Sequence, residues 1–203
     1  MKKTITALLI LSCITTFSFA QSIVLTSGSL DFIKDQKIID FSFSYEEMLV
    51  GKLTENEYVN KKISDYNKKE EGKGEQWKEA WYGDRKERFE PKFLELFDKY
   101  MGEVDIISGA EGAQYRIDIN TDFTEPGWNV GVMRQNASVD LSCKVKNIET
   151  GEQVASIKIR NASANNFWGT DFTSGYRVQE TYAKAGRELA KFFIKKAKLR
   201  KAK

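Results

Sequence analysis

The stretch YRIDINTDF, residues 115–123, decides the fold, because mainly apolar and polar side chains alternate along it without a break. Two later stretches repeat the alternation, ASVDLSCKVK at residues 137–146 and ASIKIR at residues 155–160. A period of two residues predicts β-strands with one buried and one solvated face, and sheets of this kind are usually antiparallel. We therefore expect three consecutive antiparallel strands whose apolar side is covered by another layer.

The covering layer is expected to be helical. Thr54 and Glu57 stand at capping-box spacing, which is typical of a helix start, and helical segments should follow as far as Met101, with boundaries at Gly83 and near Pro91. A last helix is expected over residues 174–197, where apolar side chains recur at helical spacing.

These patterns together predict an α+β fold. We expect a two-layer sandwich, in which a mainly antiparallel sheet has helices packed on one face. Residues 21–203 should form a single α+β domain with a helical insertion at about residues 54–101, because no linker or repeat divides the chain.

The first 20 residues have the features of a secretory signal peptide. A basic start is followed by an apolar run over residues 5–14 and by the small-residue site Ser18-Phe19-Ala20. We expect cleavage after Ala20 and a periplasmic product, with no transmembrane segment after signal removal. An alternative is the lipobox-like ILSC at residues 10–13, which would place a lipid on Cys13 and make the protein an outer-membrane lipoprotein.

The composition argues against several kinds of catalysis. The chain has no histidine, so the usual general base and every Ser-His or Cys-His arrangement are excluded. Processing would leave Cys143 as the single cysteine, which gives no zinc cluster, and no glycine-rich phosphate loop is present. We expect no metal, no cofactor and no enzymatic activity. An enzyme that cleaves cell-wall or other glycans through paired carboxylates is the alternative.

Charge is distributed unevenly along the chain. Residues 184–203 contain nine lysines and arginines against one glutamate, a net charge of +8, whereas residues 21–183 carry a net charge of −7. The basic end suits the C-terminus of a helix, and the alternative is peripheral contact with an anionic surface. We expect no nucleic-acid partner for an exported chain.

Two long connections offer a candidate binding surface, residues 124–136 and residues 161–173. In an antiparallel order of the three strands, both connections leave the same end of the sheet. We call their candidate residues the loop rim: Trp128, Met133, Arg134, Trp168 and Asp171. Aromatic and polar groups in this combination suit a sugar, a peptide or a partner protein. The alternative is that the aromatic side chains fold back over the edge of the core.

The segment from Ala113 onward resembles a known family. Ala113-Gln114-Tyr115, the turn NIETGEQV at residues 147–154 and the long last helix are similar to the periplasmic α/β domain of the curli-export lipoprotein and of the amino-terminal part of the Tol-Pal propeller protein. The whole chain is also similar to uncharacterised secreted bacterial proteins. The resemblance implies export, and with the loop rim it leads us to expect a secreted, periplasmic, non-enzymatic binding or assembly module of the cell envelope. Its partner would be an envelope protein or a glycan.

Overall fold

The three strands expected from the alternating stretches are confirmed. The computed structural model describes residues 21–130, 133–163 and 173–200. Strands β6 (Tyr115–Glu125), β9 (Ser138–Asn147) and β10 (Gln153–Ser163) lie side by side in antiparallel order. Their alternate residues are buried, as the period of two predicts, and Gly151 closes the turn between β9 and β10 with a positive φ of 71°.

The complete sheet is mixed, with the strand order β1-β10-β9-β6-β2-β5. Strand β1 (Ser22–Gly28) extends the antiparallel part, whereas β2 (Ile38–Ser44) and β5 (Ile107–Ser108) join in parallel. The short strand β3 (Leu49–Val50) continues this parallel side and pairs with β4 (Leu53–Thr54). The chain returns from β2 to β6 through three helices, and such a crossover makes its two strands parallel. The sheet is thus mainly antiparallel, as expected for this α+β fold, and it is parallel at this one edge.

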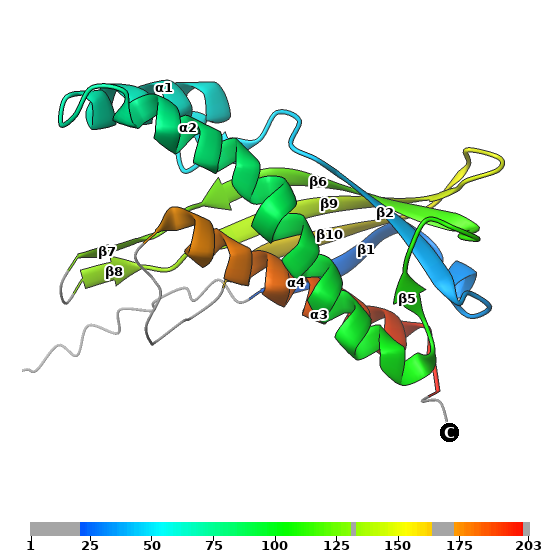
Figure 1. Cartoon of the computed structure of the whole chain (residues 1–203). Helices are drawn as coiled ribbons and strands as arrows, with labels where there is room; N and C mark the ends of the chain where they lie inside the picture. Colours follow the sequence, from blue (N-terminus) through cyan, green and yellow to red (C-terminus); the bar gives the residue numbers. More distant parts are fainter. Residues whose placement is uncertain (1–20, 131–132, 164–172, 201–203) are drawn as a thin grey trace, which may run out of the picture.

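Two helices cover one face of the sheet, α3 (Glu90–Met101) and α4 (Ser174–Lys196) (Figure 1). Phe93 and Phe97 of α3 and Phe193 of α4 are fully buried between the helices and the strands. The two helices cross closely at Gly186, where a Cβ atom would lie 2.1 Å from the carbonyl oxygen of Phe93. This is the helical layer that the sequence predicts, on one face only.

A continuous helical run leads into α3, and it contains a π-helical turn. Helix α2 (Lys73–Asp84) passes directly into η2 (Arg85–Phe89) and then into α3. The expected boundaries at Gly83 and Pro91 are therefore absent from this run. Proline lacks an N–H and its ring disturbs the preceding turn. The wider π turn, closed by the Glu90 N–H on the Arg85 carbonyl, lies where Pro91 would disturb an α-helix.

Helices α1 (Glu55–Asn67) and α2 form a hairpin that extends beyond the sheet (Figure 1). The predicted capping box of Thr54 and Glu57 begins α1. The helices approach closely at Gly74, where a Cβ would lie 2.5 Å from the Ile63 carbonyl oxygen. A small second core lies beneath the hairpin, made of Met48, Val50, Val59 and Trp81. Within the predicted insertion, α1 and α2 thus stand apart, whereas α3 belongs to the layer on the sheet.

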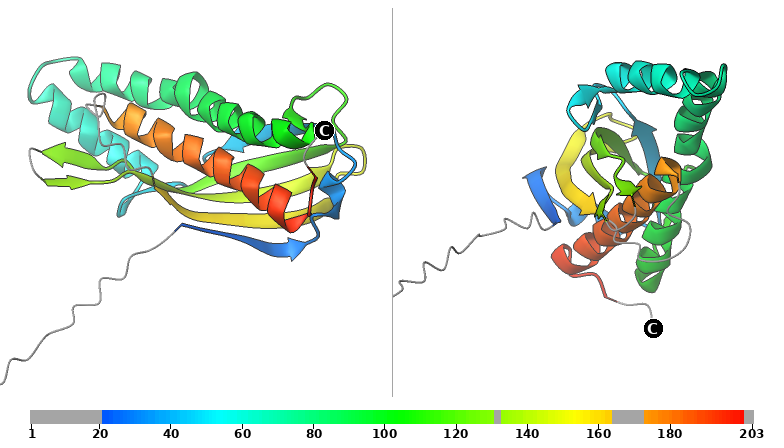
Figure 2. Two further views of the ribbon diagram at one scale, coloured as in Figure 1. Left: turned by 90° about the horizontal axis from the view of Figure 1, so that it is seen from below. Right: turned by 90° about the vertical axis from the view of Figure 1, so that its left-hand side faces the viewer.

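Short 3-10 turns complete the described chain, η1 (Asp31–Ile33) before β2 and η3 (Gly102–Val104) after α3. The opposite sheet face carries polar side chains that bond across strands. Asp118 accepts hydrogen bonds from Ser42 at 2.6 Å and forms an ion pair with Lys146 at 2.8 Å. The layers are seen end-on in Figure 2, with the helices to one side of the curved sheet.

Candidate binding cleft

The two long connections leave the same end of the sheet. Ser138 at the start of β9 pairs with Glu125 on one side and with Ser163 on the other, so β6 and β10 end together. The first connection is not an open loop. Strands β7 (Trp128–Val130) and β8 (Met133–Gln135) form a small separate hairpin that Gly127 enters with a φ of 65°.

The loop-rim residues that the structure describes lie on this hairpin. The Trp128 side chain is 41% exposed, and its Nε1 donates a hydrogen bond to Gln135 Oε1 at 3.0 Å. Met133 is 62% exposed and Arg134 is exposed. These side chains do not cover the core edge. Trp168 and Asp171 lie outside the described residues, so their meeting with Trp128 stays a prediction.

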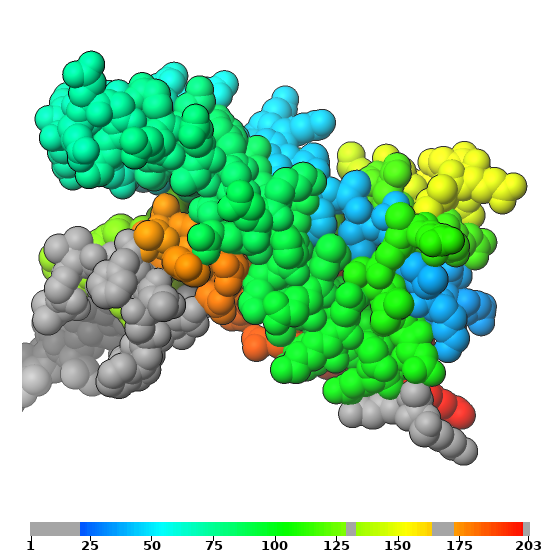
Figure 3. All heavy atoms as spheres, viewed as in Figure 1, coloured from blue at the N-terminus to red at the C-terminus, as the bar shows by residue number. Residues whose placement is uncertain are grey.

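A cleft of about 400 Å³ opens between the β7–β8 hairpin and the helical hairpin of α1 and α2. The helical hairpin forms one wall, and the first turn of α4 with the segment before β7 forms the other. In the space-filling view, α1 and α2 stand over the start of α4 (Figure 3). We call this the hairpin cleft. Its size suits a small ligand or a segment of a polymer.

Aromatic rings form the wall contributed by α1 and α2. Tyr66 and Trp77 stack with ring centroids 5.9 Å apart, and Trp77 stacks on Trp81 at 5.6 Å. Tyr58 meets Trp81 at 5.3 Å and Trp77 at 5.9 Å. Trp81 is buried and donates its indole N–H to Glu55 Oε1 at 2.6 Å. This hydrogen bond joins α2 to the start of α1.

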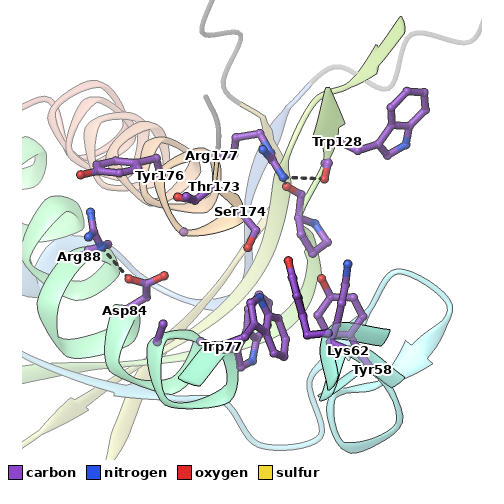
Figure 4. Close-up of a pocket in the computed structure, with 16 residues that line it drawn as sticks. Tyr58, Lys62, Trp77, Asp84, Arg88, Trp128, Thr173, Ser174, Tyr176 and Arg177 are labelled. Carbon is purple, nitrogen blue, oxygen red and sulfur yellow. Dashed lines mark hydrogen bonds and ion pairs between the residues drawn. The ribbon is translucent and has the colours of Figure 1, made fainter. Parts of the chain in front are cut away.

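Lys62 stands among these rings on α1 (Figure 4). Its Nζ lies 5.5 Å from the centroid of the Tyr58 ring, a cation–π contact. It forms no ion pair with a carboxylate of the described residues. Burial lowers the pKa of Lys62 below its ordinary value, and the nearby charges of Lys61, Lys69 and Arg177 act in the same direction. A half-buried cation in this setting favours an anion beside it.

Arg88 forms an ion pair within the helical run and a cation–π contact that joins this wall to the first turn of α4. Arg88 Nε lies 2.6 Å from Asp84 Oδ1, and the Arg88 guanidinium stacks 4.3 Å from the centroid of Tyr176. Burial raises the pKa of Asp84, while the charge of Arg88 opposes this effect. Arg88 belongs to the π turn, so this turn presents a cation to the cleft.

Arg177 holds the other wall together. Its Nε donates to the Pro126 carbonyl oxygen at 2.9 Å, and its second guanidinium nitrogen donates to the Gly127 carbonyl oxygen at 3.0 Å. These bonds tie α4 to the segment that enters β7 (Figure 4). In the same view the Trp128 indole lies apart from Lys62 and Trp77, although Trp128 also lines the cleft. The predicted rim and the hairpin cleft are therefore neighbours that share Trp128.

Most of the cleft was missed from the sequence, although a spacing signal was present. Tyr58, Lys62 and Tyr66 recur every four residues on α1, and Trp77 and Trp81 do so on α2. Such spacing places each set on one helix face. Spacing within one helix does not show that the faces of two helices meet, so the sequence alone does not predict the cleft.

Neither a metal centre nor a membrane span is found among the described residues. No three Cys, Asp or Glu side chains there cluster closely enough to hold a metal ion. Over the same ranges, no helix has the length and apolar character needed to cross a bilayer. The cleft lining that the structure describes contains one carboxylate, Asp84, and it is paired with Arg88.

Comparison with known proteins gives only distant likenesses. No protein-family model matches the chain, and no curated protein matches its sequence. The PelC dodecamer of Paraburkholderia phytofirmans aligns with 80% of this chain and 97% of its own, at 10% identity and a TM-score of 0.37. A DUF330 protein of Xanthomonas campestris aligns with 54% of this chain and 61% of its own, at 12% identity and a TM-score of 0.36. Likenesses at this level assign the chain to no family, and the expected curli-export resemblance stays a prediction.

Proposed function

We propose that this protein is a non-enzymatic binding module of the bacterial cell envelope and that the hairpin cleft takes a segment of an acidic glycan. The observation that carries the proposal is Lys62, a half-buried cation beside the Tyr58 ring in a cleft that three more aromatic rings of α1 and α2 line; Lys62 forms no ion pair with a described residue. The envelope location rests on the signal-like residues 1–20.

The chemistry of the cleft suits a sugar with an acidic group. Aromatic rings offer flat apolar surfaces that pack against sugar rings, and tyrosine adds a polar group at the edge. A lysine ammonium bonds to a carboxylate or phosphate, and a charge-assisted bond of this kind is stronger than a neutral one. Of the two other cations in the lining, Arg88 is paired with Asp84 and Arg177 donates to backbone carbonyl oxygens, so Lys62 is the group that we assign to the ligand's anion.

Cleavage of the glycan is the second candidate, and the cleft supports it less well. Glycosidases use two carboxyl groups on either side of the scissile bond. The described lining supplies Asp84 alone, and Arg88 neutralises it. Binding needs no such pair, so it is the function that we carry forward.

Titration with oligosaccharides tests the proposal. A tetrasaccharide of hexuronic acid and a neutral glucose tetrasaccharide are added to the purified protein, and tryptophan fluorescence reports binding near Trp77 and Trp81. We expect the acidic sugar to bind and the neutral one to bind at least about tenfold more weakly, which is the loss of one charge-assisted hydrogen bond. Equal binding of the two sugars would contradict the proposal, and shortened sugar products would favour the glycosidase.

A pair of lysine variants localises the site. Lys62→Met should weaken binding of the acidic sugar by about tenfold or more while leaving the fold intact, because the methionine keeps most of the side chain's apolar contact. Lys61→Met is the control, since Lys61 is exposed and pairs with Asp65 at 2.6 Å outside the cleft. Equal effects of the two variants would show that general charge, not the cleft, binds the sugar.

A further inference from the structure

We propose that the free edge of β1, together with the basic face of α4, binds an extended acidic peptide segment of a partner protein as an added β-strand. This site is separate from the hairpin cleft and goes beyond the function proposed for it. Within the described chain, β1 is the outer strand of the antiparallel side and pairs only with β10. It lies at the sheet edge beside α4 (Figure 2).

The edge of β1 carries few of the devices that usually block strand addition. Natural edge strands are protected by charges, prolines or a covering element. The seven residues of β1, SIVLTSG, contain no charge and no proline, and its one irregularity is a register shift between Leu25 and Ser27. Val24 is 46% exposed and Leu25 is 38% exposed. Alternate backbone N–H and C=O groups of such a strand point outward, where an added strand can bond to them.

A basic groove lies at the start of this edge, on the helical side of the sheet. A cavity of about 530 Å³ lies between α4 and the start of β1, where Gln21 and Ile23 line it. Its α4 side carries four cations, Lys184, Arg187, Lys191 and Lys195, against the single acid Glu188. Arg187 lies 2.8 Å and Lys191 3.4 Å from Glu188, so one carboxylate is shared by two of the four.

The spacing of these cations fits a strand with acidic residues at every second position. Arg187, Lys191 and Lys195 are four residues apart, which is about 6 Å along a helix. Two residues of a β-strand span about 6.6 Å, and every second side chain of an added strand would lie on the helical face with Ile23. Acidic side chains at those positions would lie on the same side of the sheet as these cations of α4.

The charge of α4 favours an acidic peptide over a second copy of the chain as the partner of the β1 edge. A two-fold pair of β1 strands would make a continuous sheet, but it would also bring the cations of two α4 helices toward each other. Like charges in such a position oppose association. The same cations attract an acidic strand, so we propose an acidic peptide as the occupant. Self-association of the chain is one of the outcomes that the test distinguishes.

The test uses a synthetic nine-residue peptide with glutamate at alternate positions and threonine or valine between them, labelled for fluorescence anisotropy. A matched peptide has glutamine in place of each glutamate. We expect the acidic peptide to bind the protein at least about tenfold more tightly than the glutamine peptide. Hydrogen exchange of the β1 amides should slow on binding, because strand addition protects the outward N–H groups.

Charge-reversal variants of α4 keep the test independent of β1 folding. The double variant Lys191→Glu with Lys195→Glu should lose binding of the acidic peptide by about tenfold or more. The control, Lys196→Glu with Lys198→Glu, makes the same change of net charge at two exposed residues outside the groove. Equal losses in both variants would overturn the proposal.

Three further results would also overturn it. One is binding of the acidic peptide without slower exchange in β1, which would reflect charge alone. Another is binding to anionic phosphatidylglycerol vesicles with no binding of the peptide, which would assign the basic face to a lipid surface. The third is a dimer in light scattering whose β1 amides are already protected, which would assign the edge to a second copy.

Discussion

The carboxylate of Asp84, at the end of α2, lies against the backbone of Gly175 in the first turn of α4. A Cβ atom on residue 175 would lie 2.0 Å from Asp84 Oδ2, so glycine permits the contact. Helix α4 has no acidic residue of its own in the first turn, and a carboxylate near a helix N-terminus is stabilising. The end of α2 thus supplies a carboxylate that α4 lacks, and both residues line the cleft.

Gly175→Ala should therefore destabilise the protein by about 1–3 kcal/mol, the usual cost of forcing an added methyl into a packed contact. Urea unfolding measures this change. In a double-mutant cycle, the cost of Gly175→Ala should fall when Asp84 is replaced by alanine, because the clashing carboxylate is then gone. Gly102→Ala is the matched control, since a Cβ there meets no atom within 4 Å. A cost that is the same with and without Asp84 would contradict this account.

A buried hydroxyl pair ties α4 to the centre of the sheet. Tyr182 Oη and Thr121 Oγ1 lie 2.6 Å apart, and both residues are about 1% exposed. Tyr182→Phe should cost about 1–3 kcal/mol in the free energy of unfolding, because it leaves the Thr121 hydroxyl without this partner. Thr121→Val in the Tyr182→Phe background should add little further cost, since both polar groups are then removed. Additive losses in chemical denaturation would show that the pair is not coupled.

Because three tyrosine side chains are largely buried, we expect the protein to become less stable in alkaline solution. Burial is the largest cause that raises the pKa of Tyr45, Tyr58 and Tyr182 above 10.0. Above pH 10 the unfolded chain releases these protons while the folded protein keeps them. The free energy of unfolding therefore falls as pH rises. The contribution is fully present below pH 10 and is lost as pH rises toward the folded pKa values, at up to about 1.4 kcal/mol per pH unit for each group. Unfolding midpoints between pH 8 and about pH 11, with tyrosinate absorbance as a second signal, measure this effect.

The framework of the sheet and helices could be predicted because its signals are local. Alternation in residues 115–123 and helical spacing in residues 174–197 report which face is buried, whatever the partner is. The parallel pairing of β2 with β6 has no such local signal, because Asp40 and Arg116 are distant in sequence. The π turn was missed for a related reason, since sequence shows Pro91 but not how the helix accommodates it.

The candidate site was harder to predict than the fold. Trp128 and Met133 could be placed at one end of the sheet from the strand order, but the sequence left open whether the aromatic side chain is exposed or covers the core edge. Tyr58 and Trp77 could not be combined into one site, since they meet only after Gly74 lets α1 and α2 pack closely. A binding surface formed between elements depends on tertiary contacts, and residue spacing within one element does not encode them.

Cys143 provides a last test, because its environment should make the thiol unreactive. It lies on β9, is 1% exposed, and burial, followed by the charge of Asp122, raises its pKa to about 12. The thiolate is the reactive form, so a thiol reagent at neutral pH should label it only when the protein unfolds. The experiment uses protein whose intact mass corresponds to a start at Gln21, so that Cys143 is the single thiol. Full labelling in urea and almost none under native conditions is the expected result, and rapid native labelling would mean that β9 leaves the sheet.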